Sequence, residues 1–237
     1  MGLVYEYLTY NGKSSRDFEV WISGSGTFDA PERDVESISI PGRNGDLHVD
    51  NGRFSNVPIT YPAFITKDFK HNFDAFKAYM LSQRGYKRLE DSYHPEHYRL
   101  AAYKSAINPK MGPLNRAGSF DIVFDCDPRR FLKSGEKTIN SPLSAPTTTL
   151  INPTLYEAKP LLEASGTGSV TINGIQITIT ASPTVIDCDI EEAYYGTANR
   201  NNNVVLVNGV FPTFAPGTNT ISQTVNNLKI APRWWTI

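Results

Sequence analysis

The sequence predicts a mainly β protein with one helix, in which an α+β first half is followed by a β-sandwich or jelly roll. Apolar residues alternate with polar ones along several short segments, which is the period of half-buried strands. Asn-Gly, a dipeptide that favours tight hairpin turns, occurs five times. With 237 residues and 40% apolar content, the chain can form one large β domain or two ordinary ones.

The strands of the first half are read from apolar side chains on every second residue. In the third of them, Pro58 and Pro62 fall on one side, and each removes a backbone donor. That strand should therefore lie at a sheet edge or carry a bulge, and an edge can accept a partner strand. The four alternating runs are residues 18–22, 38–40, 57–65 and 120–124.

One segment, residues 68–85, departs from this alternation. Its apolar residues recur at helical spacing, with Asp68 or Asn72 available as N-cap and Gly85 just past the end. We expect an amphipathic helix that packs across the sheet of the first half, followed by two more strands. The apolar stripe consists of Phe69, Phe73, Phe76 and Met80.

The composition of the sequence changes near residue 127. Pro, Ser, Thr and charged residues are mixed without an apolar face over 128–146, which is typical of a connection between domains. We predict domains at 1–135 and 136–237. In the second domain, SVTINGIQITI predicts a two-residue hairpin across Asn173 and Gly174.

The overall charge excludes a global attraction to nucleic acid or to an anionic membrane. Lys and Arg total 23 against 24 Asp and Glu, a formal net charge of −1. No run of 18 apolar residues and no leader pattern occurs, so we expect a soluble protein made in the cytoplasm, with no specific nucleic-acid binding and no membrane insertion. Cys126 and Cys188 should be reduced and buried on strands.

Metal and catalytic motifs are not found, so the sequence predicts no metal, no cofactor and no enzyme. His94 and His97 are the only close histidine pair, and Pro95 argues against a helix that presents both to one metal. Two acidic pairs bracket the cysteines and suggest calcium, but the turn of a calcium loop is missing, which favours solvated strand ends. These pairs are Asp125 with Asp127 and Asp187 with Asp189.

Three further segments are candidate binding sites for phosphate or for a glycan. The glycine-rich stretch at 24–31 leads to no helix, so a phosphate site is not expected there. Asn199, Arg200 and Asn201 are polar enough to touch a glycan from a loop, and Trp234 can stack on a sugar ring. The alternative for the Trp234–Trp235 pair is a terminal strand with one ring in the core and one outside.

Several motifs together resemble the distal tail (Dit) proteins of long, non-contractile-tailed bacteriophages. The resemblance begins with ERDVE followed by IPGRNGDL, and continues with GYKRLEDSYHPEHYRLA and GSFDIVFDCDP. It resumes in the second half with NPTLYEAKPLLEASGTGSVTINGIQITI, IDCDIEEAYYG and IAPRWW, and so spans nearly the whole chain. The continuous match leaves no room for an inserted module, and the chain looks like the short, uninserted form.

The resemblance implies a structural role in the virion tail tip, after assembly in the cytoplasm of the host bacterium. The first half would form a belt domain that closes into a ring, usually of six copies, and two rings can meet back to back. The second half would be a galectin-like sandwich. Such a ring joins the tail tube protein to the tail-tip protein, surrounds the path of the genome and can carry receptor-binding proteins. A carbohydrate-binding module for host recognition is the alternative; a cell-wall-degrading enzyme lacks its catalytic acid.

The loop PERDVESISIPGRNGDL is the predicted interface of this ring. Opposite charges close together can set the register, either within a subunit or across to the next. The alternative is a solvated hairpin whose surface pairs contribute about 0 to 1 kcal/mol each. The predicted interface residues are the charged Arg33, Asp34, Glu36, Arg43 and Asp46 and the turn residue Asn44. Glu32 lies beside them in the sequence.

Overall fold

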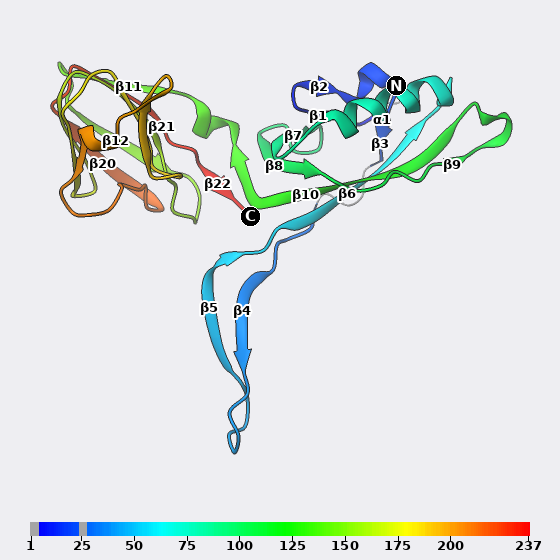
Figure 1. Ribbon diagram of the computed structural model, residues 1–237, viewed down its shortest axis with the longest axis horizontal. Helices are drawn as coiled ribbons and strands as arrows, with labels where there is room; N and C mark the ends of the chain where they lie inside the picture. The colour runs from blue at the N-terminus through cyan, green and yellow to red at the C-terminus, as the bar shows by residue number, and fades with distance from the viewer. Residues whose placement is uncertain (1–4, 24–27) are drawn as a thin grey trace. The chain divides into compact units, whose positions relative to one another are not determined.

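The computed structural model describes residues 5–23 and 28–237. The chain divides into two compact units, Met1–Arg130 together with Ile237, and Phe131–Thr236, and each has its own core (Figure 1). Part of the glycine-rich stretch, residues 24–27, lies outside the described residues. Among the residues described, no helix is both long and apolar enough to cross a membrane.

The first unit is built on one antiparallel sheet with the strand order β2-β1-β7-β8-β10-β6-β3. Buried side chains on every second residue of its long strands form one face of the core, as the alternation predicts. The short strand β9 (Lys110–Met111) adds to β10. The path consists of β1 (Leu8–Tyr10), β2 (Lys13–Ser14), β3 (Trp21–Ile22), β6 (Val57–Ile65), β7 (Lys87–Asp91), β8 (His97–Tyr103) and β10 (Gly118–Leu132).

The prolines of β6 lie as the sequence predicts, at a largely open edge. Strand β10 pairs with β6 from Val57 to Ile65, whereas β3 covers the other side only at Ala63 and Phe64. The carbonyl of Pro62 accepts a hydrogen bond from the Ser23 amide (2.8 Å) on that other side, so the prolines' nitrogens face away from β10. No ladder bond to β10 is lost, and the open edge has fewer donors for another strand.

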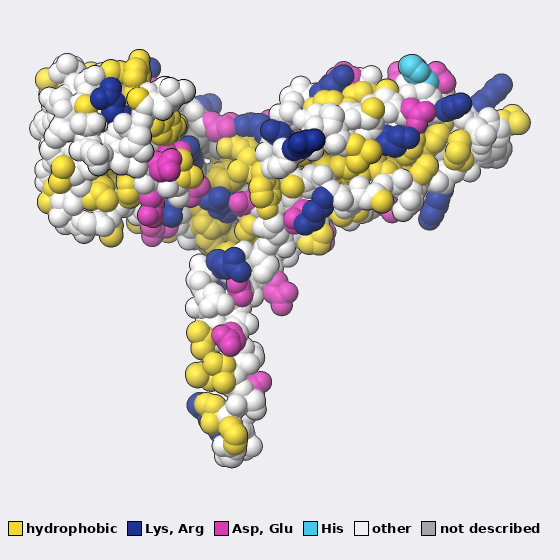
Figure 2. Space-filling view, in the orientation of Figure 1, with side chains coloured by type: hydrophobic (Ala, Val, Ile, Leu, Met, Phe, Trp, Pro, Cys, Tyr) yellow, Lys and Arg dark blue, Asp and Glu magenta, His cyan; other side chains and the backbone are white. Residues whose placement is uncertain are grey.

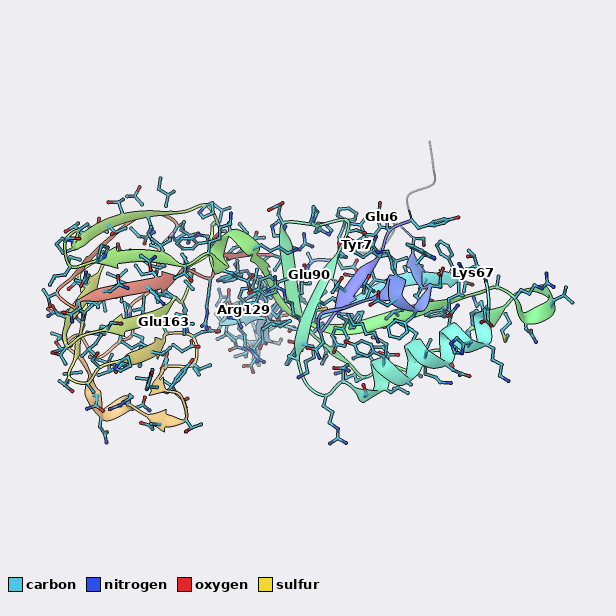
Figure 3. The ribbon with its side chains drawn as sticks, turned by 90° about the horizontal axis from the view of Figure 1, so that it is seen from above. Glu6, Tyr7, Lys67, Glu90, Arg129 and Glu163 are labelled. Atoms are coloured by element: carbon cyan, nitrogen blue, oxygen red, sulfur yellow. The ribbon has the colours of Figure 1, made fainter. Side chains whose placement is uncertain are left out.

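The predicted helix is α1 (Phe69–Ser82), and it covers the buried face of this sheet (Figures 1 and 3). All four residues of the predicted stripe are buried. The ring of Phe120, on β10, lies 5.1 Å from the Phe73 ring and 5.9 Å from the Phe76 ring. Lys67, labelled in Figure 3, precedes the helix, with its ammonium nitrogen 3.2 Å from a carboxylate oxygen of Glu19.

The second unit is a sandwich of two antiparallel sheets whose inner faces share one core, so the predicted sandwich is confirmed. The galectin-like form of this sandwich stays a prediction. One sheet is β11 (Ile139–Pro142), β21 (Asn227–Ala231), β13 (Leu161–Ser165), β16 (Thr184–Asp187), β17 (Glu192–Tyr195) and β18 (Ala198–Asn199), in that order. The other is β12 (Thr147–Asn152), β20 (Gly217–Gln223), β14 (Gly168–Ile172), β15 (Ile175–Ile179) and β19 (Val204–Leu206).

The hairpin of β14 and β15 has the predicted register. Ile172 faces Ile175, and Val170 faces Ile177. Both residues of the connecting turn have positive φ, 49° at Asn173 and 85° at Gly174, as a type I′ turn requires.

The connection between the units, expected within 128–146, contains regular secondary structure. Strand β10 continues to Leu132, a short 3₁₀ helix follows at Lys133–Glu136, and β11 starts at Ile139. Along the chain, the division into compact units falls between Arg130 and Phe131, within that range and a few residues before the limit predicted at 135 and 136. Ser and Thr look like linker residues in composition, but they also occupy edge strands, and here they do so in β11 and β12.

Candidate assembly surface

The loop nominated from the sequence forms a separate two-stranded hairpin of β4 (Arg33–Ile38) and β5 (Leu47–Phe54). Nearly every residue of both strands is exposed, so neither face is covered by the rest of the described chain. Pairing is antiparallel from Ile38 with Leu47 to Arg33 with Phe54, with a bulge between Arg33 and Val35. A hairpin without cover is only marginally stable in water, so other contacts must support this one.

The turn of this hairpin depends on two glycines. Gly42 and Gly45 both have φ of +81°, a backbone conformation that other residues adopt only with strain. The Arg43 amide donates to the Ile40 carbonyl (3.1 Å), which closes a tight turn. The sequence PGRNGD therefore returns the chain over a few residues, as turn chemistry predicts.

Charged pairs hold the two strands together at the end away from the turn. Arg33 Nη1 donates to Asp50 Oδ2 (3.1 Å), and its guanidinium lies 4.9 Å from the centre of the Phe54 ring. On the other face, Asp34 accepts hydrogen bonds from Arg53 and Asn51. The bond from Arg53, and then the one from Asn51, hold the pKa of Asp34 below its ordinary value.

The predicted interface residues thus separate into two groups. Arg33 and Asp34 are engaged inside their own hairpin, with partners on β5 that the sequence interpretation did not nominate. Arg53 was missed because a cross-strand partner depends on the register, and the bulge shifts that register. The other charged candidates, Glu36, Arg43 and Asp46, form no ion pair with any part of the chain that the structure describes, and Asn44 lies between them in the turn.

An apolar stripe runs along one face of the hairpin towards its turn, which we call the hairpin stripe. It consists of Ile38, Ile40, Leu47 and Val49. Cross-strand pairing puts Ile38 beside Leu47 and Glu36 beside Val49, so their side chains share a face. Each stripe side chain is 37% to 42% exposed, and apolar groups gather along this part of the hairpin in Figure 2. The alternation of Ile38 and Ile40 predicts half-buried positions, but no core covers them.

The residues nominated for glycan contact lie in the second unit, and most of them make hydrogen bonds or packing contacts within it. The Asn199 side chain accepts from the Asn201 amide (2.9 Å), and the Asn201 side chain accepts from the Ala193 amide (2.6 Å). Trp234 is 6% exposed and packs against Phe214, so its proposed stacking on a sugar is corrected: the ring belongs to the core. Arg200 lies between the two asparagines and is half-buried.

The second unit also contains a cavity, and none of the residues nominated for glycan contact lines it. Its volume is about 180 Å³, below the usual range for ligand pockets. Lys159, Glu191 and Thr213 line it together with apolar side chains such as Phe211.

The acidic pairs and the close histidine pair, which the sequence does not favour as metal ligands, are engaged in other contacts. Asp125 accepts from Lys104 (2.7 Å), and Asp187 accepts two hydrogen bonds from Arg233 (2.6 and 2.8 Å). His94 Nδ1 lies 3.1 Å from Asp91 Oδ1. Across residues 5–23 and 28–237, no three His, Cys, Asp or Glu side chains are placed to hold one metal ion.

A sheet covered by one helix, an uncovered hairpin and a following sandwich make up a fold that this chain shares with a solved bacteriophage tail protein. One such structure is the Dit protein of phage SPP1, described as a paradigm of the hub adsorption apparatus in phages that infect Gram-positive bacteria. The TM-score is 0.74 over 96% of this chain and 98% of that one, at 12% sequence identity. The resemblance read from the sequence motifs is therefore confirmed at the level of the fold.

A second solved structure is less similar. It is the baseplate of phage p2 in its activated conformation with strontium, with a TM-score of 0.48, 10% identity, and 97% and 98% of the two chains covered. No protein-family model and no curated protein sequence matches the chain.

Proposed function

We propose that this protein is the structural hub of a siphophage tail tip. Six copies form a ring that joins the tail tube protein to the tail-tip protein, lets the genome pass and carries receptor-binding components. The observation that supports this most strongly is an uncovered hairpin in a fold shared over 96% of the chain with a phage hub protein.

The hairpin supplies what a ring interface needs. A closed ring is built from heterologous contacts, in which one surface meets a different surface of the neighbour. The hairpin stripe offers apolar area that its own chain does not bury, and such area marks interaction sites. In the proposed ring, Arg43, Glu36 and Asp46 pair with charges of the next subunit and set the register, while Arg33 and Asp34 keep the hairpin rigid.

The charge of the chain is compatible with a passage for DNA. A ring that lets the genome through must not bind phosphates tightly, since each basic contact adds affinity. A formal net charge of −1 per chain provides no general attraction of that kind.

The test is the mass of the purified protein by light scattering, with negative-stain images of the same fraction. We expect about six times the 26.4 kDa mass of the chain, in annular particles. A monomer that stays monomeric when the tail-tip protein is added contradicts the ring.

Charge reversal then separates the two groups of charged residues. In the proposed ring, Arg43→Glu lowers the ring fraction at a given protein concentration more than Arg33→Glu does, because Arg33 already has Asp50 as a partner. If a protein with both Arg33 and Arg43 reversed still forms the ring, charge pairing by these residues does not set the register of the ring.

A further inference from the structure

The five Asn-Gly pairs of the sequence are places where a chain can deamidate without an enzyme. The glycine nitrogen attacks the side-chain amide carbon of the asparagine, a new C–N bond forms, and the amide nitrogen leaves as ammonia with the glycine N–H proton. Water then opens the cyclic imide to aspartate or isoaspartate. Glycine favours the attack because it has no side chain in the way. The pairs begin at Asn11, Asn44, Asn51, Asn173 and Asn208.

In two of these pairs the attacking nitrogen already donates a hydrogen bond. The Gly52 nitrogen, which follows Asn51, donates to Asp50 Oδ1 (2.8 Å). The Gly209 nitrogen donates to the Leu206 carbonyl (3.1 Å). Each of these bonds must break before the imide can form, which slows the reaction.

In two further pairs the asparagine side chain is held. Asn173 donates to Asn219 Oδ1 (2.6 Å) and accepts from the Thr220 amide (3.0 Å). Asn11 donates to Gln83 Oε1 (2.8 Å). Because the amide carbon has to rotate towards the next nitrogen, a bond that fixes the side chain also slows ring closure.

Asn44 is the exception. It lies in the exposed turn between β4 and β5 (Figure 1). Neither its side chain nor the Gly45 nitrogen makes a hydrogen bond with any residue that the structure describes. A carbon atom added to Gly45 would meet nothing within 4 Å, so no neighbour obstructs the attack.

We propose that Asn44 is the first site at which the folded single subunit deamidates. Aspartate at this position adds a negative charge two residues before Asp46, and isoaspartate also lengthens the backbone of the tight turn by one atom. The reaction needs only water and does not depend on the proposed ring. Its effect on assembly does rest on that ring: a subunit with the new charge enters the ring less readily.

The first test is incubation of the full chain at mildly alkaline pH, followed by tryptic digestion and mass spectrometry. Asn44 and Asn51 share the tryptic peptide 44–53, so fragment ions compare them in one molecule, and an unincubated sample corrects for reaction during digestion. In the folded chain, Asn44 should react about tenfold faster than Asn51, because a hydrogen bond must break at the second pair. In urea the two rates should converge.

Single subunits are taken from size-exclusion chromatography; if every chain assembles, Ile38→Ser with Leu47→Ser, which removes half of the hairpin stripe, supplies them. Equal rates at Asn44 and Asn51 in the folded subunit would overturn the proposal. So would a tenfold difference that persists in urea, since the local sequence and not the structure would then cause it.

The second test measures the effect on assembly by light scattering. Asn44→Asp should lower the ring fraction at a given protein concentration. Asn208→Asp is the matched control, because it adds the same charge at another Asn-Gly turn and keeps the oxygen that accepts from the Gln176 amide. A chain that forms no ring contradicts the proposed function only, whereas the rates at Asn44 and Asn51 still decide the deamidation site.

Discussion

The ion pair of Asp187 and Arg233 shows how one residue pair can link distant parts of the second unit. Two short bonds join the carboxylate to the guanidinium, and the Asp187 side chain is 9% exposed. Burial alone would raise the pKa of Asp187, but the hydrogen bonds and the charge of Arg233 outweigh it and hold that pKa below its ordinary value.

Asp187→Asn should destabilise the second unit by about 2–4 kcal/mol, because it removes the charge of a buried carboxylate that bonds twice to a partly buried guanidinium. The lowered pKa means that this stability is present above the unfolded-state pKa and is lost as the pH falls through the folded one. Urea unfolding at pH 7 and at pH 3 measures both effects. The difference between wild type and variant should shrink at pH 3.

Glu192→Gln is the matched control for this prediction. Glu192 faces Asp187 across β16 and β17 but is exposed. An Asp187→Asn protein as stable as Glu192→Gln at pH 7 would show that the ion pair contributes little.

Among the elements, the β4–β5 hairpin is the one whose role depends on what lies outside the chain. Its stripe side chains are about two-fifths exposed, so they contribute little to the stability of a single subunit. In a ring they would be buried, at about 25 cal/mol per Å² of apolar surface.

The double substitution Ile38→Ser with Leu47→Ser should therefore leave the Tm of the isolated subunit nearly unchanged and abolish the ring. Light scattering and thermal unfolding of the same samples check both statements. Ile151→Ser, on β12 and 69% exposed, is the control that removes an exposed apolar group from the sandwich instead of the hairpin. A ring that survives the double substitution would place the interface elsewhere.

For the whole molecule, the two separate cores predict two units that can be destabilised one at a time. Each core holds one free cysteine, Cys126 in the first and Cys188 in the second. Desolvation raises the pKa of each thiol to about 12, so neither reacts at pH 8 while its unit is folded.

Phe120→Ala should cost the first unit about 3–5 kcal/mol and expose Cys126 to alkylation at a lower urea concentration, while Cys188 stays protected. Phe214→Ala, at a fully buried ring of the second core, should do the reverse. Pulsed alkylation with peptide mass spectrometry measures the extent of alkylation of both thiols in one sample. Simultaneous exposure of both cysteines in each variant would mean that the chain unfolds as one cooperative body.

Local patterns predicted a large part of this architecture. The stripe from Phe69 to Met80 predicted α1, Asn173 and Gly174 predicted the β14–β15 turn, and the prolines of β6 predicted an open edge. Each of these depends on residues a few positions apart, where side-chain periodicity and backbone preference act directly. The sandwich followed from several such patterns in succession.

Contacts between residues far apart in the sequence could not be predicted from such local patterns. The partner of Asp187 is 46 positions away, and the pairing of Asp34 with Arg53 depends on a bulge. A small pocket beside Arg99 is lined by residues of the four strands β6, β7, β8 and β10, which lie far apart in the sequence.

By itself, the sequence determined the helix, the β14–β15 turn, most of the strands and the presence of two halves, because these follow from short-range periodicity and turn chemistry. Only the tertiary structure decided which apolar faces are covered. It buried Trp234 in a core and left Ile38 and Leu47 uncovered, although all three belong to alternating segments. The physical reason is that burial depends on what packs against a face, and alternation specifies only that a strand has two faces.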